Sequence, residues 1–439
     1  MGFQPNLPPH QLQLYNSLSR RVEPFIPAPS SVTIYVCGIT PYATTHLGHA
    51  FTYAMADILI RFLDYQGHRL RYVQNLTDLD DAILREARRV QEDWRSLGDR
   101  WTRHFMREMQ TLNIRPPEHY PRATDVMAEI IEAVRTLCEV GVAYEAGGSV
   151  YFDIDTWPAY GKLSGLTRQE MVSIANERGN NPDDPHKRHA LDFVLWQAHA
   201  PEEPAWDSPW GPGRPGWHIE CSTLAHHFLG ETIDIHGGGS DLMFPHHESE
   251  IAQSECLTRR EPFAHWWFHT AMVQLAGRKI SKSLGNLIMV QDLLEKYSPD
   301  AIRLYLAGHH YRHIWEHDPT VLAHAEQLAG TLRAAVTVQA RPHPLGPWDP
   351  SPKQHAFMQA MANDLDTVAA LEIMTRLAAE IRVAAQGGQS VQAAQDALRT
   401  MGRIFGLRLD DEEAEAIVVS GWNQHLACAL RQDNRTPSR

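Results

Sequence analysis

Two histidines, His46 and His49, enclose a glycine in the segment HLGH, and Cys37 stands nine residues ahead of the first of them. The β-branched residues before the segment and the helical spacing after it predict a strand-to-helix turn. Backbone N–H groups and the helix dipole at such a turn favour phosphate, and Gly48 lets a nucleotide approach closely. Taken alone, the pattern fits an ordinary helix start equally well.

A second group of candidate phosphate ligands lies in the loop GRKISKSLGN, where Lys279 and Lys282 alternate with Ser281 and Ser283. A glycine-bounded loop of this kind can fold over a triphosphate and neutralise the charge that develops on a leaving pyrophosphate. An isolated Lys/Ser loop is usually a solvated loop. Its combination with HLGH indicates nucleotide chemistry.

The elements that must position these groups follow from hydrophobic periodicity. SVTIYVCGI is a β-branched and aromatic run, HAFTYAMADILIRFLDYQGH has helical apolar spacing closed by Gly67, and LRYVQNLTD is the next apolar run. This order predicts a strand–helix–strand unit. A second set of strands and helices begins near TIDIHGGG and runs past residue 290.

Composition limits the class of protein. The net charge of −13 and the pI near 6.0 argue against broad capture of polyanions, although a local basic groove stays compatible with them. No apolar run reaches the roughly 18 residues of a membrane helix, and no signal-peptide pattern is present, so we expect a cytoplasmic protein without a membrane partner. Five widely spaced cysteines without a CxxC pair favour reduced thiols or metal ligands over disulfides.

HxGH followed more than 200 residues later by KxSKS resembles the paired signature of class I aminoacyl-tRNA synthetases. The stretches YVCG, GRPGWHIEC (213–221) and DIHGGGSDLMFPHHESE (234–250) are similar to those of the cysteine-activating members. The resemblance covers residues from about 30 to 410 and implies an α/β fold. It consists of a Rossmann (HUP) catalytic domain with an inserted subdomain and a C-terminal α-helical bundle.

The expected domains are an N-terminal extension over 1–30, a first Rossmann half over 31–125, an inserted connective subdomain over 126–210, a second Rossmann half with the KISKS loop over 211–290, a helical junction over 291–338, a proline-rich linker over 339–354 and a C-terminal helical domain over 355–439.

The resemblance further implies one zinc ion that holds the substrate cysteine by its sulfur. Its ligands would be Cys37, Cys221, His246 and Glu250. Local chemistry agrees, because thiolates are soft ligands and residues four apart share one face of a helix. Coordination through sulfur would also separate cysteine from serine without editing. For the two cysteines, burial as small hydrophobic side chains is the alternative.

The remaining site residues are carried over from the same family. Those expected around the cysteine are Gly38, Thr77, Trp217 and His236, and those expected around ATP are Gly48, Gly238, Asp241, Lys279, Ser281, Lys282 and Ser283. Core packing is the alternative role for Trp217. The cysteine carboxylate would attack the α-phosphate of Mg-ATP, with His46 and His49 stabilising the transition state and Lys279 and Lys282 the pyrophosphate.

Two relatives in this family differ in the acceptor that receives the cysteine. One is the mycothiol-pathway ligase, which uses the amine of a glucosaminyl-inositol, and the other is cysteinyl-tRNA synthetase. Stretches such as CGITPYATTHLGHA and the insertion ERGNNPDDPHKRHALDFVLW resemble the ligase. Ala43 stands where the ligase usually has Asp, and Glu250 stands where it usually lacks a carboxylate. Both are departures from the ligase, and the stretch FPHHESEIAQSE around Glu250 resembles the tRNA enzyme.

The C-terminal sequence also favours the small acceptor. After MGRIFGLRL about thirty residues remain, and no lysine follows Lys353. A tRNA enzyme of this kind would normally continue into a basic anticodon-binding module. We therefore expect a monomeric amino-sugar ligase, with tRNA charging as the alternative. A catalytically silent paralogue that only binds cysteine or adenylate is a further alternative.

Overall fold

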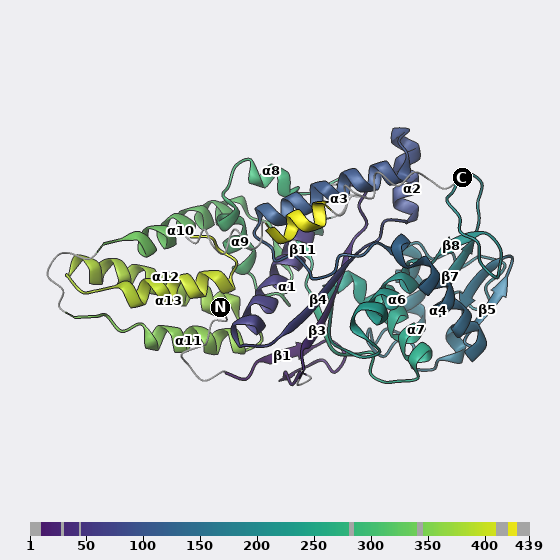
Figure 1. Ribbon diagram of the computed structural model, residues 1–439, viewed down its shortest axis with the longest axis horizontal. Coiled ribbons are helices and arrows are strands. Elements are labelled where there is room, and N and C mark those ends of the chain that lie inside the picture. Colours follow the sequence, from purple (N-terminus) through teal and green to yellow (C-terminus); the bar gives the residue numbers. More distant parts are fainter. Residues whose placement is uncertain are drawn as a thin grey trace.

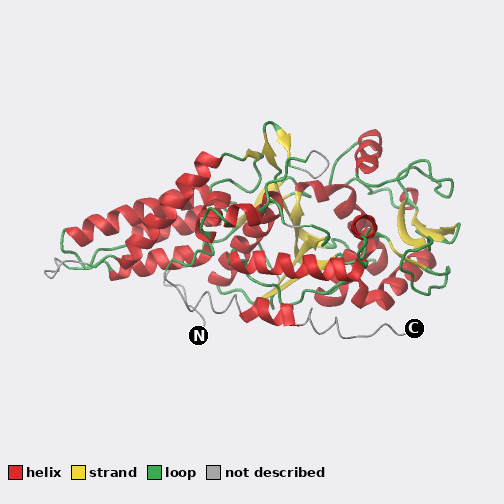
Figure 2. Ribbon diagram, turned by 90° about the horizontal axis from the view of Figure 1, so that it is seen from above, coloured by secondary structure: helices red, strands yellow, loops and turns green. Residues whose placement is uncertain are grey.

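A computed structural model describes residues 10–27, 30–43, 45–280, 285–339, 346–409 and 420–427. Figure 1 shows an elongated molecule with a parallel sheet at its centre, long helices at one end and a smaller mixed unit at the other. The long helices are α10 (Pro319–Thr337), α11 (Ser351–Ala362), α12 (Thr367–Gln386) and α13 (Gln392–Ile404). Seen from above in Figure 2, these helices pack side by side as a bundle.

The central sheet joins two parts of the chain that are about 200 residues apart. Its strands are β3 (Val32–Ile39), β4 (Leu70–Leu76), β9 (Ile233–Gly239) and β10 (Ala264–Thr270), in the order β10-β9-β3-β4. All neighbouring pairs are parallel, and Tyr35 of β3 lies opposite Val73 on one side and His236 on the other. The pairing of β3 with β9 therefore brings the YVCG and DIHGGG stretches together at the centre of the sheet.

Helix α1 (Leu47–Tyr65) connects β3 to β4 and completes the predicted strand–helix–strand unit. Its apolar residues are buried along most of its length, which explains its stability in this position. The chain leaves the helix through Gly67, whose φ of +88° is readily available only to glycine. Helices α6 (Trp217–Leu229) and α7 (Glu248–Thr258) precede and follow β9 and pack against each other.

The smaller unit lies between β4 and β9 in sequence. Four antiparallel strands form its sheet: β5 (Ala143–Ala146), β6 (Ser149–Phe152), β7 (Phe193–Ala198) and β8 (Gly213–Pro215), in that order. The helices of this region are α2 (Asp81–Val90), α3 (Trp94–Thr111), α4 (Met127–Val140) and α5 (Arg168–Glu177). Because β8 leads directly into α6, this sheet adjoins the centre of the molecule (Figure 1).

Smaller elements flank the central sheet. A hairpin of β1 (Gln13–Asn16) and β2 (Arg21–Pro24) precedes the sheet, and Ser17 N–H donates to the Trp267 carbonyl in β10 at 3.0 Å. A third sheet joins β11 (Val273–Leu275), β12 (Arg278–Lys279) and β13 (Trp315–Glu316). Helices α8 (Val290–Leu294) and α9 (Pro299–Ala307) lead toward the bundle.

The proline-rich linker expected through residue 354 ends earlier in the structure. Helix α11 begins at Ser351, with Pro352 in its first turn. Proline is compatible with that position because the first N–H groups of a helix have no intrahelical partner. The other domain boundaries stay predictions. Among the described residues, no helix is long and apolar enough to cross a membrane.

Candidate active site

Four side chains that were expected to bind a metal converge at the centre of the molecule. Ligand atoms of Cys37, Cys221, His246 and Glu250 all lie within 4.8 Å of one another, and all four residues are buried. Ligands at about 2.0–2.3 Å from a tetrahedral zinc lie about 3.3–3.8 Å apart. Two sulfurs, one imidazole nitrogen and one carboxylate oxygen at this spacing fit a zinc ion after small side-chain adjustments.

Four elements position these groups, and the last two are consecutive in the chain. Cys37 lies on β3 and Cys221 lies on α6, which packs against β3. His246 lies in a short π-helical segment, Met243–His247, which leads directly into α7 with Glu250 in its first turn. Nε2 of His246 is 3.1 Å from Oε1 of Glu250. The four-residue spacing thus places both side chains on one face, as the sequence indicated.

The other ring nitrogen of His246 is also engaged. Its Nδ1 lies 2.8 Å from Nδ1 of His218, and the indole of Trp217 stacks on it with centroids 4.2 Å apart. A histidine that binds a metal through Nε2 donates its Nδ1–H to a neighbour. His218 would then accept at Nδ1 and carry its own proton on Nε2.

A second potential ligand group shares two members with the first. Cys37, His236, His247 and Glu250 also have ligand atoms within 4.8 Å of one another. Nε2 of His236 is 2.9 Å from Oε2 of Glu250, and Nε2 of His247 is 3.3 Å from the Cys37 sulfur. His236 is 0% exposed and contacts Glu250 within the cluster. Its expected contact with the substrate cysteine stays a prediction.

Burial favours the neutral forms of several groups in this cluster. It raises the pKa values of the Cys37 thiol and the Glu250 carboxyl well above their ordinary ranges. It also lowers the pKa values of His218 and His236 to about 3. A divalent cation would reverse the preference of the thiol and the carboxyl by stabilising their anionic forms. The donor set is therefore chemically suited to a metal ion.

The HLGH turn has the geometry of a capped helix start. His46 is the N-cap of α1, and its Nδ1 accepts hydrogen bonds from Gly48 N–H at 3.1 Å and His49 N–H at 3.4 Å. These bonds fix the proton of a neutral His46 on Nε2. The rings of His46 and His49 stack with centroids 3.7 Å apart. Both imidazoles thus lie at the positive end of the helix dipole.

The chain just beyond the KISKS loop is hydrogen-bonded to the HLGH turn. Leu47 N–H donates to the Ile288 carbonyl at 2.8 Å, and Val290 N–H donates to the Thr45 carbonyl at 2.9 Å. The two signature segments are therefore adjacent in space. Ser281, Lys282 and Ser283 lie outside the described residues. Lys279 ends β12, and only its backbone is described.

The other predicted substrate contacts surround the same sheet edge. Gly38 N–H donates to Asn75 Oδ1 at 2.8 Å, and a Cβ added at Gly38 would lie 1.6 Å from the Asn75 carbonyl oxygen, so only glycine fits there. Thr77 is buried beside it, with N–H donating to the Ile39 carbonyl at 3.0 Å. Gly238 is the second-last residue of β9 and lies near His247, and Asp241 lies in the following turn, Ser240–Leu242.

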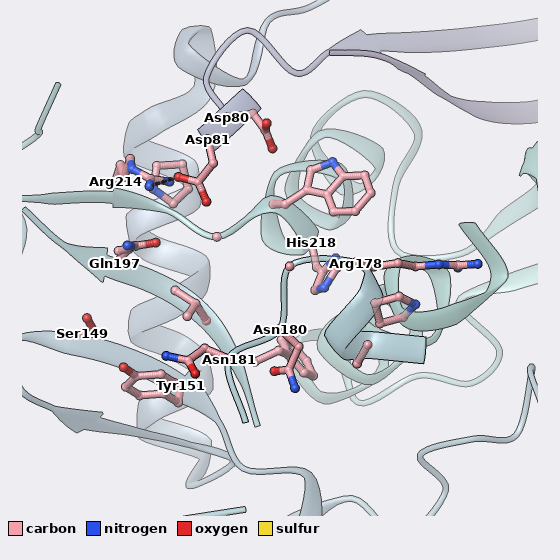
Figure 3. A pocket seen from close by; sticks show the side chains of 18 of the residues that line it. Asp80, Asp81, Ser149, Tyr151, Arg178, Asn180, Asn181, Gln197, Arg214 and His218 are labelled. Carbon is pink, nitrogen blue, oxygen red and sulfur yellow. Dashed lines mark hydrogen bonds and ion pairs between the residues drawn. The ribbon is translucent and has the colours of Figure 1, made fainter. Parts of the chain in front are cut away.

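A cavity of about 610 Å³ adjoins this site (Figure 3). Thr40, Trp217 and His218 line its side nearest the candidate metal ligands. Asp80 and Asp81 at the start of α2 and Gln197 of β7 line its other sides. Figure 3 shows these polar side chains arranged around the opening. The cavity therefore lies between the central sheet and the antiparallel sheet.

Sequence reasoning missed several residues that the fold places at the site. His218 directly follows Trp217, and His247 directly follows His246. Nothing in the sequence spacing of these two histidines marked them as site residues. His269 lies on β10 and its Nε2 is 2.8 Å from Nδ1 of His247. Only the packing of β10 against β9 brings it there.

The family comparisons agree with this geometry. Residues 26–327 match the model of the class I (C) tRNA synthetase catalytic domain, and residues 356–410 match a DALR domain. The chain is 43% identical over 428 residues to a cysteine–tRNA ligase from Dehalococcoides mccartyi, covering 97% of this chain and 92% of that protein. It therefore belongs to the class I tRNA synthetase family.

Further relatives place the chain within the cysteine group of that family. A cysteine–tRNA ligase from Thermosynechococcus vestitus is 43% identical over 440 residues, covering 95% of this chain and 90% of that protein. A third relative is the L-cysteine:1D-myo-inositol 2-amino-2-deoxy-α-D-glucopyranoside ligase of Thermomonospora curvata. It is 41% identical over 406 residues, covering 92% of this chain and 95% of that protein. The chain is an ATP-dependent ligase of the class I cysteine group.

Among solved structures, a methionyl-tRNA synthetase of Mycobacterium tuberculosis with bound methionyl-adenylate is similar to this chain. The two structures have a TM-score of 0.60 at 15% sequence identity. The matched region covers 93% of this chain and 94% of the methionyl-tRNA synthetase chain. This likeness shows the α/β class I fold. The comparisons do not support the sequence-based preference for the amino-sugar acceptor, because most of the similar curated proteins are cysteine–tRNA ligases.

Proposed function

We propose that this chain activates L-cysteine with Mg-ATP to form cysteinyl adenylate and pyrophosphate, and then transfers the cysteinyl group to tRNA. In the second step the acceptor hydroxyl attacks the carbonyl carbon of the adenylate. The bond from that carbon to the phosphate oxygen breaks, AMP leaves, and the hydroxyl loses its proton. The expected monomeric state and cytoplasmic location stay predictions.

The metal site supports the choice of cysteine. Cys37, Cys221, His246 and Glu250 would hold zinc, and the bound ion would take the substrate sulfur as an additional ligand. Trp217 borders both His246 and the cavity, so its indole would limit the space around the substrate side chain. Serine would be excluded because a hydroxyl is a poor ligand for such a sulfur-rich site.

The capped turn supports the activation step. Nε2–H of His46 and the N-terminus of α1 would bind the α-phosphoryl group as negative charge increases on it. His49 stacks on His46 and would contribute from the same side. Lys279 and Lys282 would neutralise the departing pyrophosphate. The hydrogen bonds that join residues 45–47 to residues 288–290 would keep these two groups in register.

Similarity to cysteine–tRNA ligases is the observation that carries the choice of tRNA, and Glu250 agrees with it. The Glu250 side chain is 0% exposed, and its two oxygens contact His246 and His236 at 3.1 and 2.9 Å. A carboxylate at this position is what the tRNA-charging enzymes have and the amino-sugar ligases usually lack. Ala43 is a second departure from the amino-sugar ligases, which usually have Asp at this position.

The amino-sugar ligase is the second candidate, and one observation favours it. Residues of the insertion that resembles the ligase, including Asn180, Asn181 and Lys187, line the cavity next to the metal site. A glucosaminyl-inositol offers several hydroxyl groups that such polar side chains can bind. In that case an amine would attack the same carbonyl carbon and an amide would form.

Mass spectrometry of one reaction offered both acceptors distinguishes these candidates. We expect cysteinyl-tRNA and AMP, with no cysteinyl amide of the sugar. Amide without cysteinyl-tRNA would overturn the tRNA assignment and support the second candidate. Absence of any cysteine-dependent ATP–pyrophosphate exchange would instead support a silent cysteine- or adenylate-binding paralogue.

A further inference from the structure

We propose that the cavity between α2, β7 and α6 binds the sugar unit of the acceptor that carries the attacking nucleophile, and that Gln197 and Lys187 recognise its hydroxyl groups. This inference rests on the proposed transfer of cysteine. Its ligand class is a sugar with free hydroxyls, whether the terminal ribose of a tRNA or a small amino sugar.

The location of the cavity fits this role. Trp217 and His218 line it on one side, and the same two residues contact His246, at 4.2 Å between ring centroids and 2.8 Å between nitrogens. A nucleophile must come within about 3–3.5 Å of the activated carbonyl. A sugar in this cavity would lie next to a cysteine held at the metal site.

The lining is polar and preorganised. Lys187 Nζ donates to Asn180 Oδ1 at 2.6 Å, and the Tyr151 hydroxyl donates to Asp184 Oδ2 at 2.8 Å. These contacts hold the lysine and the aspartate on the wall formed by the insertion. An ammonium has three N–H donors, and the bond to Asn180 uses one of them. The volume of about 610 Å³ is within the range of small-ligand sites.

Gln197 is the strongest candidate for recognition of the sugar hydroxyl groups. It lies on β7, lines the cavity in Figure 3, and its side-chain amide makes no hydrogen bond within the described part of the chain. An amide offers both donors and an acceptor, which suits vicinal hydroxyls. Its replacement by alanine therefore removes no described intramolecular bond.

The experiment compares Gln197→Ala and Lys187→Met with Arg188→Met as the matched control. Arg188 is adjacent in sequence but pairs with Asp153 at 3.1 Å and lies over the Tyr144 ring, outside the cavity lining. Two activities are measured for each variant. The first is cysteine-dependent ATP–pyrophosphate exchange, and the second is cysteinyl transfer to tRNA and to glucosaminyl-inositol in separate arms.

We expect unchanged exchange in all three variants. In Gln197→Ala and Lys187→Met, kcat/KM for the acceptor should fall about 3- to 10-fold through a higher KM, the size expected for one lost hydrogen bond. Equal loss of exchange and transfer, unchanged transfer, or the same loss in Arg188→Met would each overturn the inference.

The two arms separate this inference from the proposed function. If the wild-type enzyme modifies only the amino sugar, the tRNA assignment fails. A raised KM for that sugar in the variants would still support the proposal that the cavity binds the sugar of the acceptor. If the wild-type enzyme exchanges pyrophosphate but transfers cysteine to neither acceptor, both proposals fail.

Discussion

At the scale of single residues, the site is a buried set of potential metal ligands, and burial favours the protonated forms of Cys37 and Glu250. Burial raises the pKa of Glu250 and of Cys37, so each alone would keep its proton. Metal binding would release those protons, and metal affinity should fall as the solution becomes more acidic. The same burial keeps His218 and His236 neutral and able to support the ligands.

Replacement of one sulfur ligand tests the metal assignment. We expect Cys221→Ala to lower zinc affinity by more than about 100-fold, because loss of a supporting partner alone costs up to about that much. The rate of cysteine-dependent ATP–pyrophosphate exchange should fall together with the zinc content of the protein. Atomic emission measures the zinc content. Cys138→Ala is the control, since Cys138 is a free, half-buried thiol on α4. Intact exchange with an intact preference for cysteine over serine in Cys221→Ala would contradict the zinc site.

At the scale of elements, the His46 side chain at the start of helix α1 serves two purposes, one for each ring nitrogen. The side chain caps the helix through Nδ1, and the same bonds orient Nε2–H away from the backbone. Glu108 of α3 accepts a hydrogen bond from Thr45 N–H at 3.3 Å and so holds the residue before the cap. The HLGH turn is therefore fixed by neighbouring elements and not by its own sequence alone.

Two substitutions separate capping from catalysis. We expect His46→Asn to retain the cap, because asparagine is a strong N-cap residue, while ATP–pyrophosphate exchange falls about 10²- to 10³-fold with loss of the Nε2–H donor. We expect His46→Ala to lose the same activity and also about 1 kcal/mol of stability. Urea denaturation and exchange assays measure the two effects. Equal stability of the two variants would show that the cap is unimportant.

At the scale of the whole molecule, one buried ion pair connects the catalytic unit to the helical bundle. Asp57 of α1 lies 2.5 Å from Arg303 of α9, and both side chains are 1% exposed. Arg303 also donates to the carbonyls of Phe405, at 2.6 Å, and Leu112, at 3.1 Å. Burial favours the neutral form of Asp57, but Arg61 and Arg303 outweigh it, so its pKa lies below its ordinary value.

Removal of the buried arginine should destabilise the junction. We expect Arg303→Met to lower the free energy of unfolding by about 3–5 kcal/mol, because it leaves Asp57 with an incomplete set of partners. Arg376→Met breaks an exposed pair with Glu372 in the bundle and should cost no more than about 0.5 kcal/mol. Urea denaturation followed by circular dichroism compares them. Similar small losses in both would contradict a special role for the Asp57–Arg303 pair.

The sequence by itself determined the α/β class and the strand–helix–strand unit, and it named the four side chains that converge as candidate metal ligands, because these depend on local periodicity and on motifs that resemble one family. The roles of those site residues stay predictions. The sequence did not indicate His269, the cavity beside Trp217, or the Asp57–Arg303 pair. Each of these joins segments that are far apart in the chain, and such contacts arise only when strands and helices pack. The preferred acceptor changed because most of the similar curated proteins are cysteine–tRNA ligases, and not because of the geometry of the site.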